Sequence, residues 1–138
     1  MKYPMKALLA AVAMFFAVNA SACGIGEQVD GYEIATVKHA HEHWQGGEKS
    51  PIPFTFIDVR TPEEYAEGHI QGARLIPLQE LAERMAEVPK NRRVYLYCRS
   101  GKRSAAAANI LVKAGFTNIE NIEGGINAWK GAGYPVVK

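Results

Sequence analysis

Short apolar runs alternate with amphipathic or alanine-rich stretches along most of the chain. An apolar run rich in β-branched and aromatic residues predicts a buried strand at 54–57, and 94–97 predicts another. Short strands are expected at 73–76 and 118–122. Between them, Thr61 and Gly68 delimit one expected helix, and alanine-rich residues 105–114, followed by Gly115, predict another. Apolar residues at a spacing of three to four predict a helix at 78–88, and the segment that begins at Gly125 suits a short helix at 125–130. Strands that alternate with helices indicate an α/β layered domain with parallel pairing.

The first 22 residues differ from the rest. Lys2 and Lys6 precede an unbroken apolar stretch at 7–18, and Ala20-Ser21-Ala22 follows it. This pattern predicts a cleaved export signal and therefore a periplasmic or secreted protein. The apolar stretch is too short for a membrane span, which needs about 20 residues, so no membrane span is expected.

Residues 23–53 read as a lead-in to the main domain. We expect a short helix at 32–44, ended by Gly46-Gly47. The segment Ser50-Pro51-Ile52-Pro53 predicts a linker, because two prolines remove backbone donors. The expected organisation is therefore a signal peptide at 1–22, a lead-in at 23–53 and one domain at 54–138.

Length and charge narrow the class of protein. A chain of 138 residues suggests one domain. The whole chain has 16 basic and 14 acidic residues, but removal of residues 1–22 leaves 14 of each. No basic excess points to nucleic-acid binding, so we expect no nucleic-acid partner.

The two cysteines are Cys23 and Cys98, too few for a disulfide-stapled scaffold. Cys23 would stand at or near the new N-terminus. Lipid attachment there is one interpretation, although Ala20 occupies the place where a lipobox usually has Leu. A Cys23–Cys98 disulfide in an oxidising compartment is another, and the sequence leaves both open.

Cys98 carries the candidate chemistry. It stands where the strand 94–97 ends, and the loop Arg99-Ser100-Gly101-Lys102 leads through Arg103 and Ser104 into a helix. Ligands of open α/β sheets bind beyond the carboxyl ends of strands. Loop N–H groups, a helix N-terminus and basic side chains all favour the thiolate form of cysteine, which is the nucleophile. A small core residue is the simpler reading of Cys98, but it explains neither the glycine nor the three basic residues.

These residues resemble the rhodanese family, whose loop has a cysteine, four residues and a basic residue. Three further stretches match. They are 56–65 (FIDVRTPEEY), Gly68 to Ala73 with Ile76-Pro77, and Gly124-Gly125 with Ala128-Trp129 and 133–136. The resemblance covers 54–136. It implies a rhodanese-like three-layer α/β domain: a mostly parallel five-stranded sheet with helices on both faces.

The resemblance also implies a reaction. Cys98 would accept a sulfane sulfur from thiosulfate or a similar donor, and its persulfide would pass the sulfur to cyanide or a thiol acceptor. The amides of Arg99, Ser100, Gly101, Lys102 and Arg103 would hold the outer sulfur, with Ser104 supporting the loop. Arg99 and Lys102 would attract the anionic donor, and Arg103 would orient the loop. No cofactor and no metal are implied. A thiol redox partner is a further expectation, because an exported thiol must be kept reduced.

Other polar residues have two interpretations each. Asp58 either holds a basic loop residue such as Arg103 or satisfies local backbone donors. Arg60 correspondingly either braces the site or pairs with Glu63 or Glu64. His69 supports a turn in the family pattern rather than acting as a base.

The run His39, His41 and His43 could offer two ligands to a metal on one helix face, or could simply belong to a polar helix. The family pattern has no metal there, so we expect none.

Two other functions compete with sulfur transfer. One is a persulfide carrier or protein-interaction module. The other is phosphatase-like or arsenate-reductase-like chemistry, for which related enzymes carry five residues between cysteine and arginine rather than the four found here. The oligomeric state and the physiological donor and acceptor are not determined by the sequence.

Overall fold

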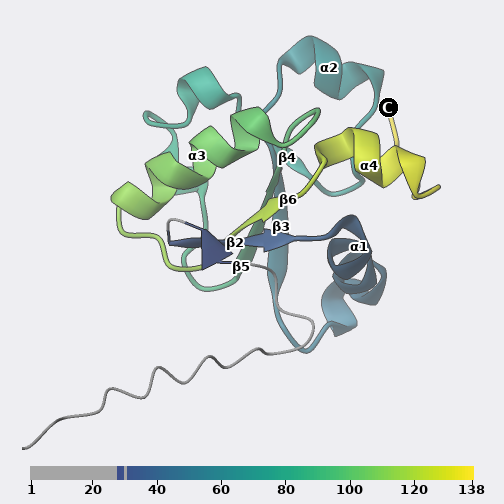
Figure 1. Ribbon diagram of the computed structural model, residues 1–138, viewed down its shortest axis with the longest axis horizontal. Helices are drawn as coiled ribbons and strands as arrows, with labels where there is room; N and C mark the ends of the chain where they lie inside the picture. Colours follow the sequence, from purple (N-terminus) through teal and green to yellow (C-terminus); the bar gives the residue numbers. More distant parts are fainter. Residues whose placement is uncertain (1–27, 30) are drawn as a thin grey trace, which may run out of the picture.

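A computed structural model describes residues 28–29 and 31–138, and its centre is one six-stranded sheet in the order β1-β2-β6-β5-β3-β4 (Figure 1). The strands are β1 (Gln28–Val29), β2 (Tyr32–Ala35), β3 (Phe54–Asp58), β4 (Arg74–Leu75), β5 (Arg93–Tyr97) and β6 (Ile119–Ile122). Strands β2 to β6 are all parallel, which confirms the expected parallel sheet. The two-residue β1 adds an antiparallel edge to it.

Helices cover both faces of the sheet, as the α/β pattern predicts. The α-helices are α1 (Val37–Gly46), α2 (Pro62–Glu67), α3 (Lys102–Lys113) and α4 (Gly125–Gly131). In Figure 1, α3 lies on one side of the sheet and α1 and α4 on the other. Strand β5 serves both layers, because Val94 and Leu96 join the core under α3 whereas Tyr95 and Tyr97 join the core under α1 and α4.

The expected helix at 32–44 is wrong in its first third. Residues Tyr32–Ala35 form β2, which pairs in parallel with β6, and α1 begins only after Thr36. The Thr36 hydroxyl accepts a hydrogen bond from the His39 amide at 3.2 Å, which caps the helix. The pairing with β6 joins residues about 85 positions apart in sequence, so local spacing did not reveal it.

The expected helix at 78–88 is also wrong. The chain there forms two short 3-10 helices, η2 (Leu78–Glu80) and η3 (Met85–Glu87), and η1 (Gly47–Lys49) is a third elsewhere. Leu81 and Val88 are nevertheless buried, at 0% and 4% exposure, and the partly buried Leu78 and Met85 pack against the same core. A spacing of three residues fits a 3-10 turn as well as an α-helix, so the burial pattern did not distinguish them.

The remaining helices follow the local signals. Helix α2 begins after Thr61, as expected; Thr61 and Glu64 form a capping box there, with Pro62 in the first turn. Helix α3 begins at Lys102, three residues before the predicted start, because Gly101 is its N-cap. No helix among the described residues is long and apolar enough to cross a membrane.

Candidate active site

Cys98 lies just beyond the carboxyl end of β5, in the loop of residues 98–103 that leads into α3. We call this segment the Cys98 loop. The cysteine is only 1% exposed, and it belongs to the core on the α3 side of the sheet. Gly101 adopts a φ of 102°, which a residue with a side chain rarely does, so glycine permits the turn from strand to helix.

The sulfur of Cys98 accepts hydrogen bonds from the middle of the loop and from the first turn of α3. The Gly101 amide lies 3.1 Å from Sγ, and the hydroxyl of the fully buried Ser104 lies 3.4 Å from it. These donors point at the place where a thiolate would carry its charge. The arrangement therefore favours an anionic sulfur.

Two opposing effects set the pKa of the Cys98 thiol. Burial raises this pKa, whereas hydrogen bonds from the Ser104 hydroxyl and from the amides of Ser104, Gly101 and Ser100 lower it. The hydrogen bonds prevail, and the pKa lies below its ordinary value. The thiolate, which is the nucleophilic form, is correspondingly more populated at neutral pH.

The basic residues of the Cys98 loop fall into two groups. Arg99 and Lys102 are exposed, and within the described part of the chain neither forms an ion pair. Arg103 forms a bidentate pair with Glu64, at 2.7 and 2.9 Å. Glu64 thereby joins the start of α2 to the start of α3. The sequence analysis considered Glu64 as an ion-pair partner of Arg60, and its pair with Arg103 was missed.

Asp58 and Arg60 bind each other rather than the Cys98 loop. The Arg60 guanidinium donates to both carboxylate oxygens of Asp58, at 2.7 to 3.1 Å, and the Arg60 amide donates to the same carboxylate at 3.0 Å. Of the two interpretations of Asp58, the one in which it satisfies a local backbone donor is confirmed, and the contact with Arg103 is wrong. A pair between Arg60 and Glu63 or Glu64 is also wrong, because Arg60 pairs with Asp58. Both residues are buried at the carboxyl end of β3 and stiffen the turn that leads to α2.

Gly125 at the start of α4 was another missed contributor to the site. Its φ is 57°, and a Cβ atom there would lie 2.7 Å from the Arg99 carbonyl oxygen. Only glycine lets α4 approach the Cys98 loop so closely. The amides of Ile126 and Asn127 then donate to the carbonyls of Cys98 and Arg99, at 2.9 and 3.1 Å. The pair Gly124-Gly125 in the sequence was the available signal.

The histidines take up structural contacts. His69 bonds through Nδ1 to the Tyr65 carbonyl at 2.9 Å and stacks on the Tyr65 ring. His41 stacks on Tyr134, whereas His43 lies 2.6 Å from the Tyr95 hydroxyl and His39 contacts the Arg93 guanidinium. Within the described residues, no three His, Cys, Asp or Glu side chains form a group that could hold a metal.

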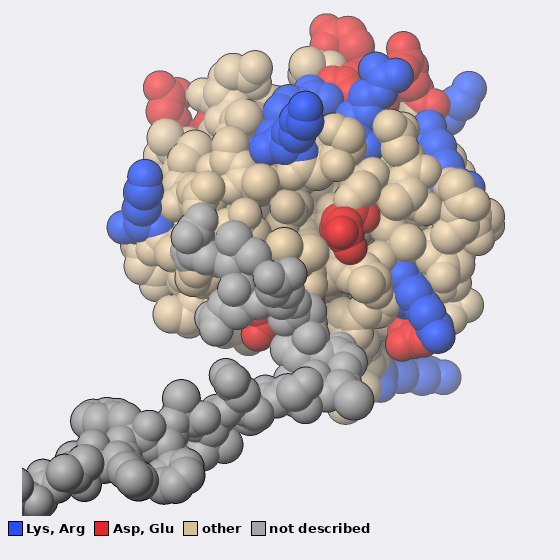
Figure 2. Space-filling view, in the orientation of Figure 1, with Lys and Arg blue, Asp and Glu red and all other residues tan. Residues whose placement is uncertain are grey.

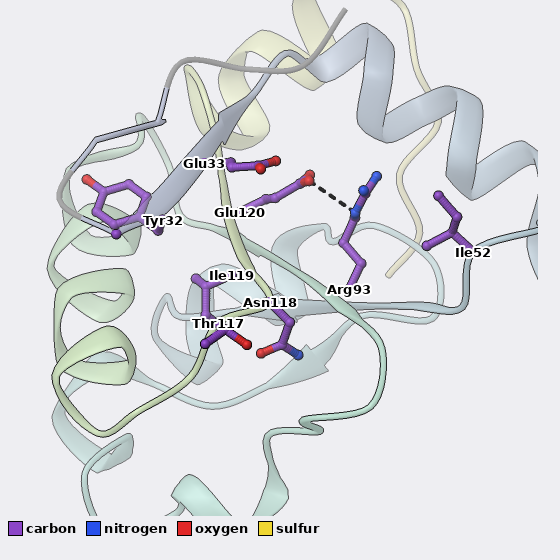
Figure 3. Close-up of a pocket in the computed structure, with 9 residues that line it drawn as sticks. Tyr32, Glu33, Ile52, Arg93, Thr117, Asn118, Ile119 and Glu120 are labelled. Carbon is purple, nitrogen blue, oxygen red and sulfur yellow. Dashed lines mark ion pairs between the residues drawn. The ribbon is translucent and has the colours of Figure 1, made fainter. Parts of the chain in front are cut away.

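A separate cavity of about 270 Å³ lies at the amino end of β2, β5 and β6, away from Cys98 (Figure 3). The buried Glu120 faces it and pairs with Arg93 at 3.0 Å. Glu33 stands beside Glu120 in the strand register, and Figure 3 shows the two carboxylates on the same side of the ribbon. On the face seen in Figure 2, basic and acidic side chains are interspersed along the upper rim, so its charge is mixed.

Comparisons with known proteins found matches over more than half of the chain. Residues 39–132 match the family model described as "Rhodanese-like domain". The chain is 44% identical over 81 residues to a protein named "Sulfurtransferase" from Allochromatium vinosum, which covers 59% of this chain and 76% of that relative. It is 45% identical over 87 residues to "Thiosulfate sulfurtransferase PspE" of Escherichia coli, covering 62% and 72%.

Solved structures give the same fold. The crystal structure of a rhodanese-related protein from Thermoplasma volcanium superposes with a TM-score of 0.68 at 34% identity. The match covers 77% of this chain and 98% of the other.

Proposed function

The chain belongs to the rhodanese-like domain family, and from this premise we propose that it is a thiosulfate sulfurtransferase that works through a persulfide on Cys98. The family itself implies transfer of sulfur from a donor to an acceptor. One observation carries the finer proposal: the Cys98 sulfur sits at a strand end and accepts hydrogen bonds from Gly101 and Ser104, at 3.1 and 3.4 Å. A thiolate held in this way is a nucleophile for sulfane sulfur.

The reaction has two steps. The Cys98 thiolate attacks the outer sulfur of thiosulfate, an S–S bond forms, and the bond to the sulfonate sulfur breaks. Sulfite leaves with the electron pair of that bond, and Cys98 becomes a persulfide with one negative charge. Cyanide or a thiolate then attacks the outer sulfur, which restores the Cys98 thiolate. The loop amides stabilise the negative charge in each state.

Charged residues of the Cys98 loop have separate roles in this proposal. Arg99 and Lys102 are exposed and free of ion pairs within the described residues, so they can attract an anionic donor. Arg103 is bound to Glu64 and fixes the end of the loop. That pairing also disfavours phosphatase chemistry, in which the arginine must turn toward the oxyanion.

We further propose that the protein is exported. The support is the sequence pattern of residues 1–22, which lie outside the described residues, as does Cys23. The intact mass of protein isolated from the producing cell tests this. It identifies the cleavage site and any lipid on Cys23, and a mass that retains residues 1–18 contradicts export.

The test of the reaction compares three proteins: the parent, Cys98→Ser and Cys23→Ser. We expect thiosulfate-to-cyanide transfer in the parent and the Cys23 variant, and only background transfer in the Cys98 variant with an unchanged circular dichroism spectrum. Turnover of an aryl phosphate faster than thiosulfate would contradict the proposal. A stable adduct of about 32 Da on Cys98 without transfer to cyanide or thiols would instead indicate a carrier.

A further inference from the structure

Asn121 is a buried polar residue in a layer that is apolar apart from Ser104 beside Cys98. In β6, Ile119 and Asn121 both point toward the face covered by α3, where the surrounding core is hydrophobic. Asn121 is only 6% exposed. Its Nδ2 donates to the Gly101 carbonyl at 3.3 Å, whereas its Oδ1 has no partner among the described residues. An unpaired buried amide oxygen costs stability, so the residue is poorly explained by folding alone.

Asn121 is one of three donors that hold the Cys98 loop from outside. The other two are the backbone amides of Ile126 and Asn127 at the start of α4. We call the three together the outer donor ring. They bind the carbonyl oxygens of Gly101, Cys98 and Arg99 respectively, at 3.3, 2.9 and 3.1 Å.

The carbonyl side of a peptide unit determines where its amide points. In a trans peptide the C=O and the next residue's N–H point in opposite directions, and the described backbone contains only trans peptides. Each bond from the outer donor ring therefore turns one following N–H away from the donor. The amides turned in this way are those of Arg99, Ser100 and Lys102.

For the two donors of α4, the sulfur lies on the side to which the amides of Arg99 and Ser100 turn. Helix α4 packs on one face of the sheet, whereas Cys98 belongs to the core on the opposite, α3 face. Gly101 adopts a φ of 102°, and its amide donates directly to Sγ of Cys98. Alternating right-handed and left-handed backbone of this kind forms an anion-binding concavity.

We propose that Asn121 is a positioning residue for the chemistry of Cys98: it holds Gly101, whose own amide donates to the sulfur, while the start of α4 fixes the carbonyls of Cys98 and Arg99. The role deepens the sulfurtransferase proposal and rests on it for its purpose. The experiment that tests the role of Asn121 needs only the reactivity of the Cys98 thiol and does not depend on the sulfurtransferase proposal.

The same contacts separate a positioning role from a folding role. The Gly101 carbonyl also accepts the Ala105 amide at 3.1 Å, so α3 keeps its first backbone bond without Asn121. Leucine has nearly the shape of asparagine and would remove the unpaired Oδ1 from an apolar layer. Asn121→Leu should therefore leave the fold as stable as the parent or more so, while it loosens the Gly101 peptide.

Asn118 offers a matched control on the approach to the same strand. Its Nδ2 donates to the carbonyls of Pro89 and Arg92, at the end of β6 remote from Cys98. Asn118→Leu removes two hydrogen bonds from a turn without touching the outer donor ring. It should lower the urea midpoint and leave the thiol unchanged.

The experiment measures the rate of Cys98 alkylation by iodoacetamide from pH 5 to 10, in a Cys23→Ser background, together with the urea midpoint. We expect Asn121→Leu to raise the apparent pKa of the Cys98 thiol by about 0.5 to 1 unit, which is a threefold to tenfold loss of thiolate below that pKa. The charged neighbours Arg99, Lys102, Arg103, Glu64, Asp58 and Arg60 are the same in every variant.

Two results would overturn the role of Asn121. One is a Cys98 thiol pKa that is the same as in the parent in both Asn121→Leu and Asn121→Asp. The second of these variants replaces the donor by an acceptor. The other is loss of the fold in Asn121→Leu, which would make the residue structural. Neither depends on a sulfur donor. A parent that alkylates as expected but does not use thiosulfate would contradict the proposed function and leave the positioning role standing.

Discussion

Burial and hydrogen bonding act on the Cys98 thiol in opposite directions. Burial by itself would favour the neutral thiol and make the residue an inert part of the core. The Ser104 hydroxyl and the loop amides reverse this and lower the pKa. Whether a buried cysteine is structural or reactive is therefore decided by the donors around its sulfur.

Ser104 provides the test at this scale, because its hydroxyl is the strongest of the groups that lower the pKa of Cys98. Ser104→Ala should raise that pKa. Thiolate forms as the pH rises through the pKa, so the alkylation profile of the variant should move to higher pH, with about a threefold to tenfold slower rate at pH 7. Superimposable pH profiles of parent and variant would show that the hydroxyl does not stabilise the thiolate.

At the scale of elements, Glu64 couples two helices. Its carboxylate caps α2 through Thr61 and pairs with Arg103 at the start of α3. The hydrogen bond from Arg103 lowers the pKa of Glu64 to about 2, and the opposing effect of burial is smaller. The Cys98 loop is thus held between α2 and α4, with one ion pair and one set of backbone bonds.

Glu64→Gln should cost about 0.5 to 1 kcal/mol in the free energy of unfolding at pH 7, because the ion pair is partly exposed. The lowered pKa of Glu64 means that this contribution is present above its ordinary pKa of 4.5 and lost as the pH falls through about 2. Urea unfolding at pH 7 and pH 2.5 measures it, with the exposed neighbour Glu63→Gln as the control. A parent–variant difference of equal size at both pH values would argue against the ion pair.

At the scale of the whole molecule, two clusters of ionisable groups lie at opposite ends of the sheet. The Cys98 loop occupies the carboxyl end, and Glu120, Glu33 and Arg93 occupy the amino end (Figure 3). Burial, assisted by Glu33 and opposed by Arg93, raises the pKa of Glu120 to about 7. Between pH 4.5 and 7, the folded protein therefore keeps a proton on Glu120 that the unfolded chain has already released.

The free energy of unfolding should consequently fall as the pH rises from 4.5 to 7, because only the folded protein keeps the Glu120 proton in this range. Glu120→Gln, which is neutral at every pH, should remove about 2 kcal/mol of this decline. Urea unfolding of parent and variant across that range measures the difference. Parallel stability curves would mean that Glu120 is ionised throughout.

Local patterns determined much of this protein from sequence alone. The strands at 54–57 and 94–97, the capping box of α2 and the strand–Cys98–loop–helix unit depend on neighbours within a few residues, so their signals were legible. The parallel α/β class followed from the order of those elements. The family resemblance rested on the same short stretches.

Tertiary structure alone decided which partner each residue has. Residues 32–35 became a strand because β6 lies beside them, and residues 78–88 became 3-10 turns while their apolar side chains still reached the core. Glu64 meets Arg103 across 39 positions, and Asn121 meets Gly101 across 20. The sequence shows which hydrogen-bonding groups a residue carries, but only the packed fold determines which partner atoms lie within about 3 Å of them.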